Sequence, residues 1–163
     1  MNLVPIDGSF GDWDALLALI LSSFAYMQPR IDPPSSALHL TLQSLAEKAR
    51  VEKAYAALDK GRLLGCVFCK PEPPDCVYIG KLAVSPDAQG KGVGRLLLQA
   101  AEAYAAECGL SCLRLETRIE LAENHLVFGK WGFVRTAEGC HHGFARPTFV
   151  EMRKPLCSTA RYS

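Results

Sequence analysis

One stretch decides the fold of this 163-residue chain: Leu82-Ala83-Val84-Ser85-Pro86-Asp87-Ala88-Gln89-Gly90-Lys91-Gly92-Val93-Gly94-Arg95. An apolar run that ends at Val84 predicts a strand, and the apolar spacing from Val93 to Cys108 predicts a helix that Gly109 closes. Three glycines in five residues separate the two, at a helix start whose free backbone N–H groups can approach a ligand closely. The stretch therefore predicts an anion site of the kind that binds phosphate.

Two basic side chains strengthen this prediction, because Lys91 and Arg95 add charge where the helix dipole already favours an anion. The P-loop pattern fails, since Gly92 and not Ser or Thr follows Lys91. The dinucleotide pattern lacks its third glycine, although Glu116 ends the next predicted strand, where a ribose-binding acid would stand. A nucleotide cofactor and a flexible turn therefore stay as alternatives to a phosphate-binding loop.

The segments around this unit predict a mixed α/β fold. Strands are expected at residues 2–6, 55–58, 63–68, 77–84 and 112–117, from Gly132 onward, and at 148–152, with a turn at 71–74. Helices are expected after Asp12, from Ser35 or Ser36 through Ala49, and at 123–131. The order strand, helix, strand from Val77 to Thr117 is that of a parallel crossover, which indicates a mixed sheet with helices on both faces. Residues 1–155 are expected to form a single domain, and residues 156–163 a polar tail.

Composition excludes several classes of protein. Apolar residues make up 49% and charged residues 21% of the chain, which is far from the composition of a disordered protein. The net charge of +1 supplies no bulk attraction to nucleic acid. The apolar run Ala15–Leu21 is much shorter than the roughly 20 residues that span a bilayer, and Met1–Phe10 lacks a signal-peptide pattern. We therefore expect a cytoplasmic protein without nucleic-acid or membrane partners.

The cysteines do not suggest a metal site or a disulfide framework. There are seven, an odd number, and most lie in apolar segments, so reduced thiols are expected. Cys66 and Cys69 have a spacing that zinc sites use, but residues three apart on a strand point to opposite faces. The adjacent histidines of Cys140-His141-His142 point apart on an extended chain for the same reason. No metal is predicted.

Three segments together resemble the GCN5-related N-acetyltransferase (GNAT) family, whose members transfer an acetyl group from acetyl-CoA to an amine. They are Leu82-Ala83-Val84 followed by Gln89-x-x-Gly92-x-Gly94, then Glu123-Asn124, then Gly132-Phe133. The resemblance implies a mostly antiparallel sheet of six to seven strands, with a splayed central parallel pair and about four helices on both faces. It also implies acetyl-CoA as cosubstrate, no metal, and a small-molecule or peptide amine as partner. A homodimer through the late strands stays open.

The resemblance further implies which residues hold the cofactor. Backbone groups of the strand end would bind pantetheine and orient the thioester, and these belong to Leu82, Ala83 and Val84. The loop would bind the pyrophosphate through Gln89, Gly90, Lys91, Gly92, Val93, Gly94 and Arg95. Asn124 would contact pantetheine, with a helix cap as the alternative role. At Phe128 many relatives carry a tyrosine that protonates the departing thiolate, so this general acid is absent here.

The acceptor amine must be neutral to attack, although a lysine-like amine has a pKa near 10.4. Glu116 is the first candidate for the base, because it should lie at the end of a central strand beside the splay, and Tyr78 is the second. The expected acceptor pocket comprises Tyr26, Arg30, Arg118 and His141, with Glu120 and His142 beside them. Solvated loop charges are the alternative interpretation of these residues. No cysteine has an evident histidine partner, which disfavours a covalent acetyl-cysteine route. A non-catalytic acyl-CoA-binding module is the alternative that Phe128 favours.

Overall fold

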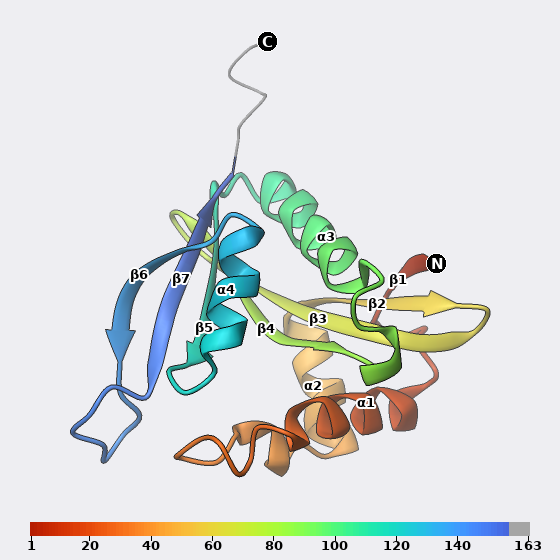
Figure 1. Cartoon of the computed structure of the whole chain (residues 1–163). Coiled ribbons are helices and arrows are strands. Elements are labelled where there is room, and N and C mark those ends of the chain that lie inside the picture. The colour runs from red at the N-terminus through yellow and green to blue at the C-terminus, as the bar shows by residue number, and fades with distance from the viewer. Residues whose placement is uncertain (157–163) are drawn as a thin grey trace.

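The computed structural model describes residues 1–156 as one sheet with helices on both sides (Figure 1). The strands are β1 (Asn2–Pro5), β2 (Lys53–Asp59), β3 (Arg62–Glu72), β4 (Cys76–Val84), β5 (Cys112–Arg118), β6 (Val134–Gly139) and β7 (Phe149–Pro155). The helices are α1 (Trp13–Ala25), α2 (Leu42–Val51), α3 (Val93–Glu107) and α4 (Ala122–Lys130), with short 3₁₀ segments η1 (Ser36–His39) and η2 (Pro86–Ala88). Apart from Leu156, the expected polar tail at 156–163 lies outside the described residues.

The sheet has the order β1-β2-β3-β4-β5-β7-β6, and among these pairs only β4 and β5 run parallel. Their pairing covers three positions, from Cys76 opposite Cys112 to Tyr78 opposite Arg114. Beyond that point β4 continues to Val84 and β5 to Arg118 without pairing to each other. The expected fold class is therefore confirmed, including the splayed parallel pair at the centre of the sheet.

Each face of the sheet has its own apolar core. Helices α1 and α2 cover one face, and α3 and α4 lie over the other (Figure 1). Cys66 packs in the core with α1, whereas Cys69 packs in the core with α3. The predicted opposite orientation of these two cysteines is thus confirmed, and burial raises the pKa of each thiol to about 12.

Some predicted boundaries were wrong for local reasons. The single helix expected from Ser35 or Ser36 through Ala49 is divided into η1 and α2, because Thr41 and Ser44 form a reciprocal capping box that starts a new helix. Strand β3 extends through Pro71, which was assigned to a turn. Gly132 and Phe133 precede β6, which begins at Val134.

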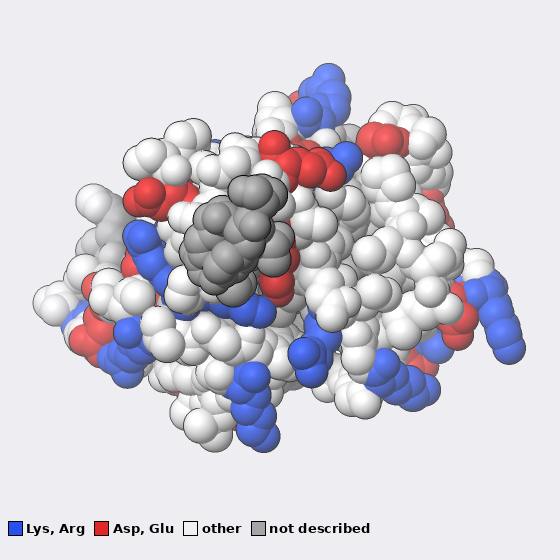
Figure 2. All heavy atoms as spheres, turned by 90° about the horizontal axis from the view of Figure 1, so that it is seen from above, with Lys and Arg blue, Asp and Glu red and all other residues white. Residues whose placement is uncertain are grey.

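One face of the molecule shows how its charged side chains are distributed. On the face of residues 1–156 drawn in Figure 2, basic and acidic side chains are interspersed among uncharged ones. Among the described helices, none has the length and apolar character needed to cross a bilayer.

Candidate functional site

A cleft of about 290 Å³ lies where β4 and β5 diverge. Its wall includes side chains from α1, η1, both diverging strands, α4 and the start of β7. The lining residues are Phe24, Met27, Ser35, Ser36, Tyr78, Ile79, Gly80, Lys81, Leu82, Leu115, Glu116, Thr117, Arg118, Leu121, Asn124, Phe128, His141 and Phe149. The cleft therefore runs from one face of the sheet to the other, through the gap between the two strands.

The cleft brings together seven of the eighteen site residues expected from the sequence. Seven expected residues line it, namely Tyr78, Leu82, Glu116, Arg118, Asn124, Phe128 and His141. The rest do not, namely Tyr26, Arg30, Ala83, Val84 and the loop Gln89, Gly90, Lys91, Gly92, Val93, Gly94 and Arg95. Ala83 is buried in the core under α1, so only its backbone can reach a ligand. The carbonyl of Val84 accepts a hydrogen bond from the Ser23 hydroxyl, 3.3 Å away.

The glycine loop has the geometry that an anion site requires. Gly90 and Gly92 have φ values of 80° and 84°, a region that side chains rarely adopt, and Gly92 is the N-cap of α3. The first backbone N–H groups of α3 have no carbonyl four residues earlier within the helix. Lys91 and Arg95 are exposed beside them, whereas Val93 is buried in the core. The loop thus presents donors and positive charge at one helix start.

The third glycine of the loop also has a packing role. A Cβ atom at Gly94 would lie 2.9 Å from the ring of Trp131, which follows α4 directly. Real Cβ atoms do not approach a rigid ring that closely, so Gly94 allows α3 to pack against the end of α4. The contact ties the loop to the helix that carries Asn124 and Phe128.

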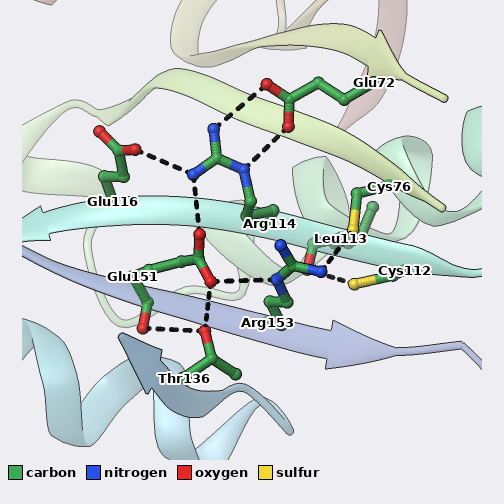
Figure 3. Close-up of polar contacts among 9 residues, drawn as sticks. All are labelled: Glu72, Cys76, Cys112, Leu113, Arg114, Glu116, Thr136, Glu151 and Arg153. Carbon is green, nitrogen blue, oxygen red and sulfur yellow. Dashed lines mark hydrogen bonds and ion pairs between the residues drawn. The ribbon is translucent and has the colours of Figure 1, made fainter. Parts of the chain in front are cut away.

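Glu116 belongs to an ion-pair cluster centred on Arg114 (Figure 3). The Arg114 guanidinium donates to Glu116 Oε2 at 2.9 Å, to Glu72 Oε1 at 2.8 Å and to Glu151 Oε2 at 3.2 Å. These carboxylates come from β3, β5 and β7, so one arginine connects three strands. The hydrogen bonds orient the Glu116 carboxylate at the edge of the cleft and neutralise part of its charge.

Tyr78 lies directly beside this cluster. The Arg114 guanidinium carbon is 4.7 Å from the centre of the Tyr78 ring, a cation–π contact. Burial, followed by the charge of Glu116, raises the pKa of the Tyr78 hydroxyl. The phenol therefore stays protonated at neutral pH, where it can donate a hydrogen bond.

The charged residues expected in the acceptor pocket have partners within the protein. Arg30 forms an exposed ion pair with Glu123, and Arg118 donates to the carbonyls of Pro33 and Pro34 at 2.7 and 3.1 Å. His141 contacts Thr148 through both its backbone N–H and its ring, and burial lowers its pKa. Arg30 and Arg118 therefore hold the segment between α1 and η1 in place.

Comparisons with known proteins agree with this geometry. Residues 13–133 match the family model for the acetyltransferase (GNAT) family. The chain belongs to the GNAT acetyltransferase family. An IAA acetyltransferase of Azospirillum brasilense is 30% identical over 144 residues, which cover 88% of this chain and 92% of that protein.

Two further comparisons cover different lengths. Mycothiol acetyltransferase of Rhodococcus opacus (strain B4) is 37% identical over 87 residues, 50% of this chain but 28% of that protein. This chain thus matches little more than a quarter of that relative's length. The PaiA N-acetyltransferase of Thermoplasma acidophilum, solved in complex with coenzyme A, superposes with a TM-score of 0.77 at 17% identity. That match covers 96% of this chain and 100% of the other, and it shows a shared fold.

Asn124 and Phe128 on α4 differ in how their surroundings fit the roles expected from the sequence. Leu121 is the N-cap of α4, and within residues 1–156 no side chain caps that helix, so the alternative role of Asn124 as a cap is wrong. Phe128 packs edge-to-face against Trp131 and Phe133, with ring centres 5.9 and 5.7 Å apart. Position 128, where a tyrosine hydroxyl would serve as the general acid, is therefore part of an aromatic cluster.

Sequence reasoning missed several residues of the GNAT cleft. Phe24 and Phe149 form apolar walls, and they looked like ordinary core positions. Gly139 makes room for Phe149, because a Cβ there would lie 2.3 Å from its ring, and no local pattern signals that contact. Lys81 also lines the cleft, and it did carry a signal, since it is a lysine within an otherwise apolar strand.

The residues considered for metal binding do not converge. Cys140 is exposed and His142 points to solvent, whereas His141 lines the cleft. Over residues 1–156, no group of three or more His, Cys, Asp or Glu side chains gathers in a metal-binding arrangement. A larger groove of about 680 Å³ between the β1–α1 loop and α2 lies away from the splay. None of the residues expected at the site lines that groove, so the cleft at the splay is the candidate functional site.

Proposed function

We propose that this protein transfers an acetyl group from acetyl-CoA to a primary amine, by direct attack in a ternary complex. The observation that carries the proposal is the unpaired edge of β4 beyond Tyr78, which faces a cleft that opens on both sides of the sheet. Such an edge offers backbone donors and acceptors to an extended ligand. Family membership and the relatives named as acetyltransferases support acetyl as the group that is transferred. Residues 1–155 would act as a single acetyltransferase domain.

Acetyl-CoA would bind along the path from the glycine loop to the cleft. The free N–H groups at the start of α3, with Lys91 and Arg95, suit the pyrophosphate. Pantetheine would then lie along the β4 edge near Leu82 and Val84, within reach of the Asn124 amide. A backbone N–H of β4 would stabilise the oxyanion that forms when the thioester is attacked. The CoA held by the PaiA neighbour supports this choice of ligand.

The amine would enter from the side of the cleft that carries Tyr78, Glu116 and His141. Glu116 is suited to bind the ammonium form and to remove its proton, directly or through water, so that the neutral amine attacks. Tyr78 would act as a hydrogen-bond donor, because its raised pKa disfavours a role as base. Holding both reactants in one cleft supplies much of the rate enhancement.

The leaving thiolate would be protonated by water. Phe128 has no hydroxyl, and general-acid help is typically worth about 10²–10⁴-fold. A thiol with a pKa of about 8.5 leaves readily near neutral pH, so the reaction is slowed but not prevented. The same Phe128 favours the second candidate function, a module that binds acyl-CoA without turning it over.

The first test is a thermal-shift titration with acetyl-CoA, CoA, NAD and ATP. A ligand at 100 times its Kd adds about 2.7 kcal/mol of stability, which is readily measured. We expect acetyl-CoA and CoA to raise the Tm and NAD and ATP to leave it unchanged. Stabilisation by NAD or ATP alone would overturn the proposal.

The second test separates an enzyme from a binding module. CoA release from acetyl-CoA is followed across a panel of amines that includes polyamines, amino acids and short peptides. We expect release to depend on at least one amine and, with acetyl-CoA well below saturation, to fall at least about tenfold in the Gly92→Asp variant. Tight acetyl-CoA binding without any amine-dependent release would instead support the acyl-CoA-binding module.

A further inference from the structure

Lys81 has an unusual backbone position within the candidate site. Along β4, Lys81 and Leu82 together oppose the single residue Val67 of β3, which makes a β-bulge. Lys81 has a φ of 48°, a left-handed conformation that a lysine rarely adopts. Bulges re-aim side chains, and this one lets Lys81 line the same cleft as Tyr78. The bulge thus directs the Lys81 side chain toward the cleft, at the point where β4 and β5 have separated.

The surroundings of the Lys81 amine leave it available for reaction. Its Nζ atom donates a long hydrogen bond of 3.3 Å to the Ser36 hydroxyl oxygen of η1. None of the salt bridges among residues 1–156 includes this lysine. Burial, followed by the charge of Lys48, lowers its pKa, while Glu52 acts in the opposite direction. A larger fraction of this amine is therefore neutral than of an exposed lysine at the same pH.

We propose that Lys81 is itself an acetyl acceptor, modified by the protein when acetyl-CoA occupies the cleft and no amine substrate does. The inference rests on the proposed binding of acetyl-CoA along β4. In the reaction the lone pair of neutral Nζ attacks the thioester carbonyl, so that a C–N bond forms and the C–S bond breaks. The electron pair leaves on sulfur, and the proton lost from nitrogen passes through water to the thiolate. The products are acetyl-Lys81 and free CoA.

Self-acetylation would also change the site. The acetylated side chain is longer and uncharged, so it would occupy part of the acceptor end of the cleft and remove its positive charge. Turnover of an amine would then compete with modification of the protein. A cleft that receives substrate stays active, whereas one left with acetyl-CoA alone becomes blocked.

The experiment incubates the purified full chain with acetyl-CoA in the absence of added amine and follows each lysine by peptide mass spectrometry. Lys60 and Lys130 are exposed and report ordinary chemical acetylation. Because the reactants are held together, we expect Lys81 to be modified at least about tenfold faster than these two. Free CoA should appear in an amount that matches the chains modified. Excess CoA should suppress modification of Lys81 and leave Lys60 and Lys130 unchanged.

Two variants and one binding measurement separate the possible failures. Lys81→Arg keeps the charge but should not be acetylated at this position, and Gly92→Asp should slow Lys81 modification to the rate of the exposed lysines. Acetyl-CoA binding is measured by thermal shift on the same preparation. Binding without preferential modification of Lys81 overturns this inference and leaves the proposed function standing. Absence of acetyl-CoA binding overturns both.

Discussion

Glu116 shows how neighbours can orient a single side chain that we propose as the proton acceptor. Its carboxylate accepts from Arg114, and Arg114 is shared with Glu72 and Glu151 (Figure 3). Alternation along β5 places Arg114, Glu116 and Arg118 on one face, while Leu113 and Leu115 enter the core. The sequence predicted the position of Glu116 at the strand end, but the arginine that orients it could not be paired with Glu72 or Glu151 from sequence alone.

Replacing Glu116 with glutamine tests the proton-accepting role. Gln keeps the size and most hydrogen bonds but cannot take a proton, so we expect kcat/KM for an amine substrate to fall about 10²-fold with the fold intact. Glu72→Gln is the matched control, because Glu72 also pairs with Arg114 but does not line the cleft. An equal loss in both variants would show that the cluster acts only as structure.

Phe128 offers a gain-of-function test on α4. Phe128→Tyr places a hydroxyl where the cleft meets the expected thioester, and donation to the thiolate should raise kcat on the order of tenfold. Phe128→Leu, which also lacks a hydroxyl, should show no gain. A tyrosine variant with native stability and unchanged kcat would mean that thiolate protonation is not limiting.

At the scale of elements, the glycine loop and α3 act as one unit. The strand end, the loop and the helix were predicted from local patterns, because left-handed glycines and helical spacing are properties of adjacent residues. The packing of Gly94 on Trp131 was not predicted, since it joins two helices about forty residues apart in the chain. The loop therefore combines a packing contact with the proposed phosphate site, and only the phosphate site could be predicted from adjacent residues.

A charge in the loop tests the phosphate assignment. Gly92→Asp adds a carboxylate at the start of α3, where it competes with a phosphate, so acetyl-CoA affinity should fall at least about tenfold. Gly61→Asp is the control, because Gly61 has a similar φ of 78° and equally open surroundings in the β2–β3 turn. Calorimetry should show weakened binding for the first variant alone. Unchanged affinity of the Gly92 variant would contradict the assignment.

The segment between α1 and η1 is held to the opposite side of the cleft by polar contacts. Arg118 binds the carbonyls of Pro33 and Pro34, Arg30 pairs with Glu123, and Arg146 pairs with Asp32 at 3.1 Å. The sequence identified Arg30 and Arg118 as candidates for substrate contact. The sequence could not indicate that both arginines would instead bind carbonyl and carboxylate groups of distant segments of the chain.

The Arg30–Glu123 contact should make this segment sensitive to pH. The hydrogen bond from Arg30 lowers the pKa of Glu123 from 4.5 to about 2. The stabilisation that this ion pair gives to the folded segment is therefore present above pH 4.5 and is lost as the pH falls toward 2. At neutral pH, Glu123→Gln should speed hydrogen exchange in residues 26–34, and this difference from the wild type should shrink as the pH falls through that window. A difference that does not depend on pH would exclude the ion pair as its cause.

At the scale of the whole molecule, the central splay creates the cleft of the candidate site, and Arg114 connects the strands beside it. β4 and β5 pair over only three positions, so the sheet depends there on side chains as well as on backbone hydrogen bonds. Arg114 connects β3, β5 and β7 and covers the ring of Tyr78. A cluster of this kind stabilises the two halves of the sheet while it leaves the gap between the strands open.

Removal of Arg114 should therefore destabilise the whole domain. Arg114→Leu leaves Glu72, Glu116 and Glu151 without their shared donor, and we expect a loss of about 1–3 kcal/mol in the free energy of unfolding. Arg135→Leu removes an exposed ion pair with Glu138 on β6 and should cost less than about 1 kcal/mol. Urea unfolding of both variants makes the comparison. Equal effects would mean that the cluster contributes no more than a surface pair.

The sequence by itself determined the strand, glycine loop and helix around Gly92, the α/β class and the absence of a hydroxyl at Phe128. These depend on backbone conformation and periodicity, which adjacent residues control. Only the tertiary structure decided which polar side chains are free: Arg30 and Arg118 have partners within the protein, whereas Lys81 faces the cleft from a bulge. The reason is physical, because the partner of a side chain comes from segments that are distant in sequence and meet only when the sheet is assembled.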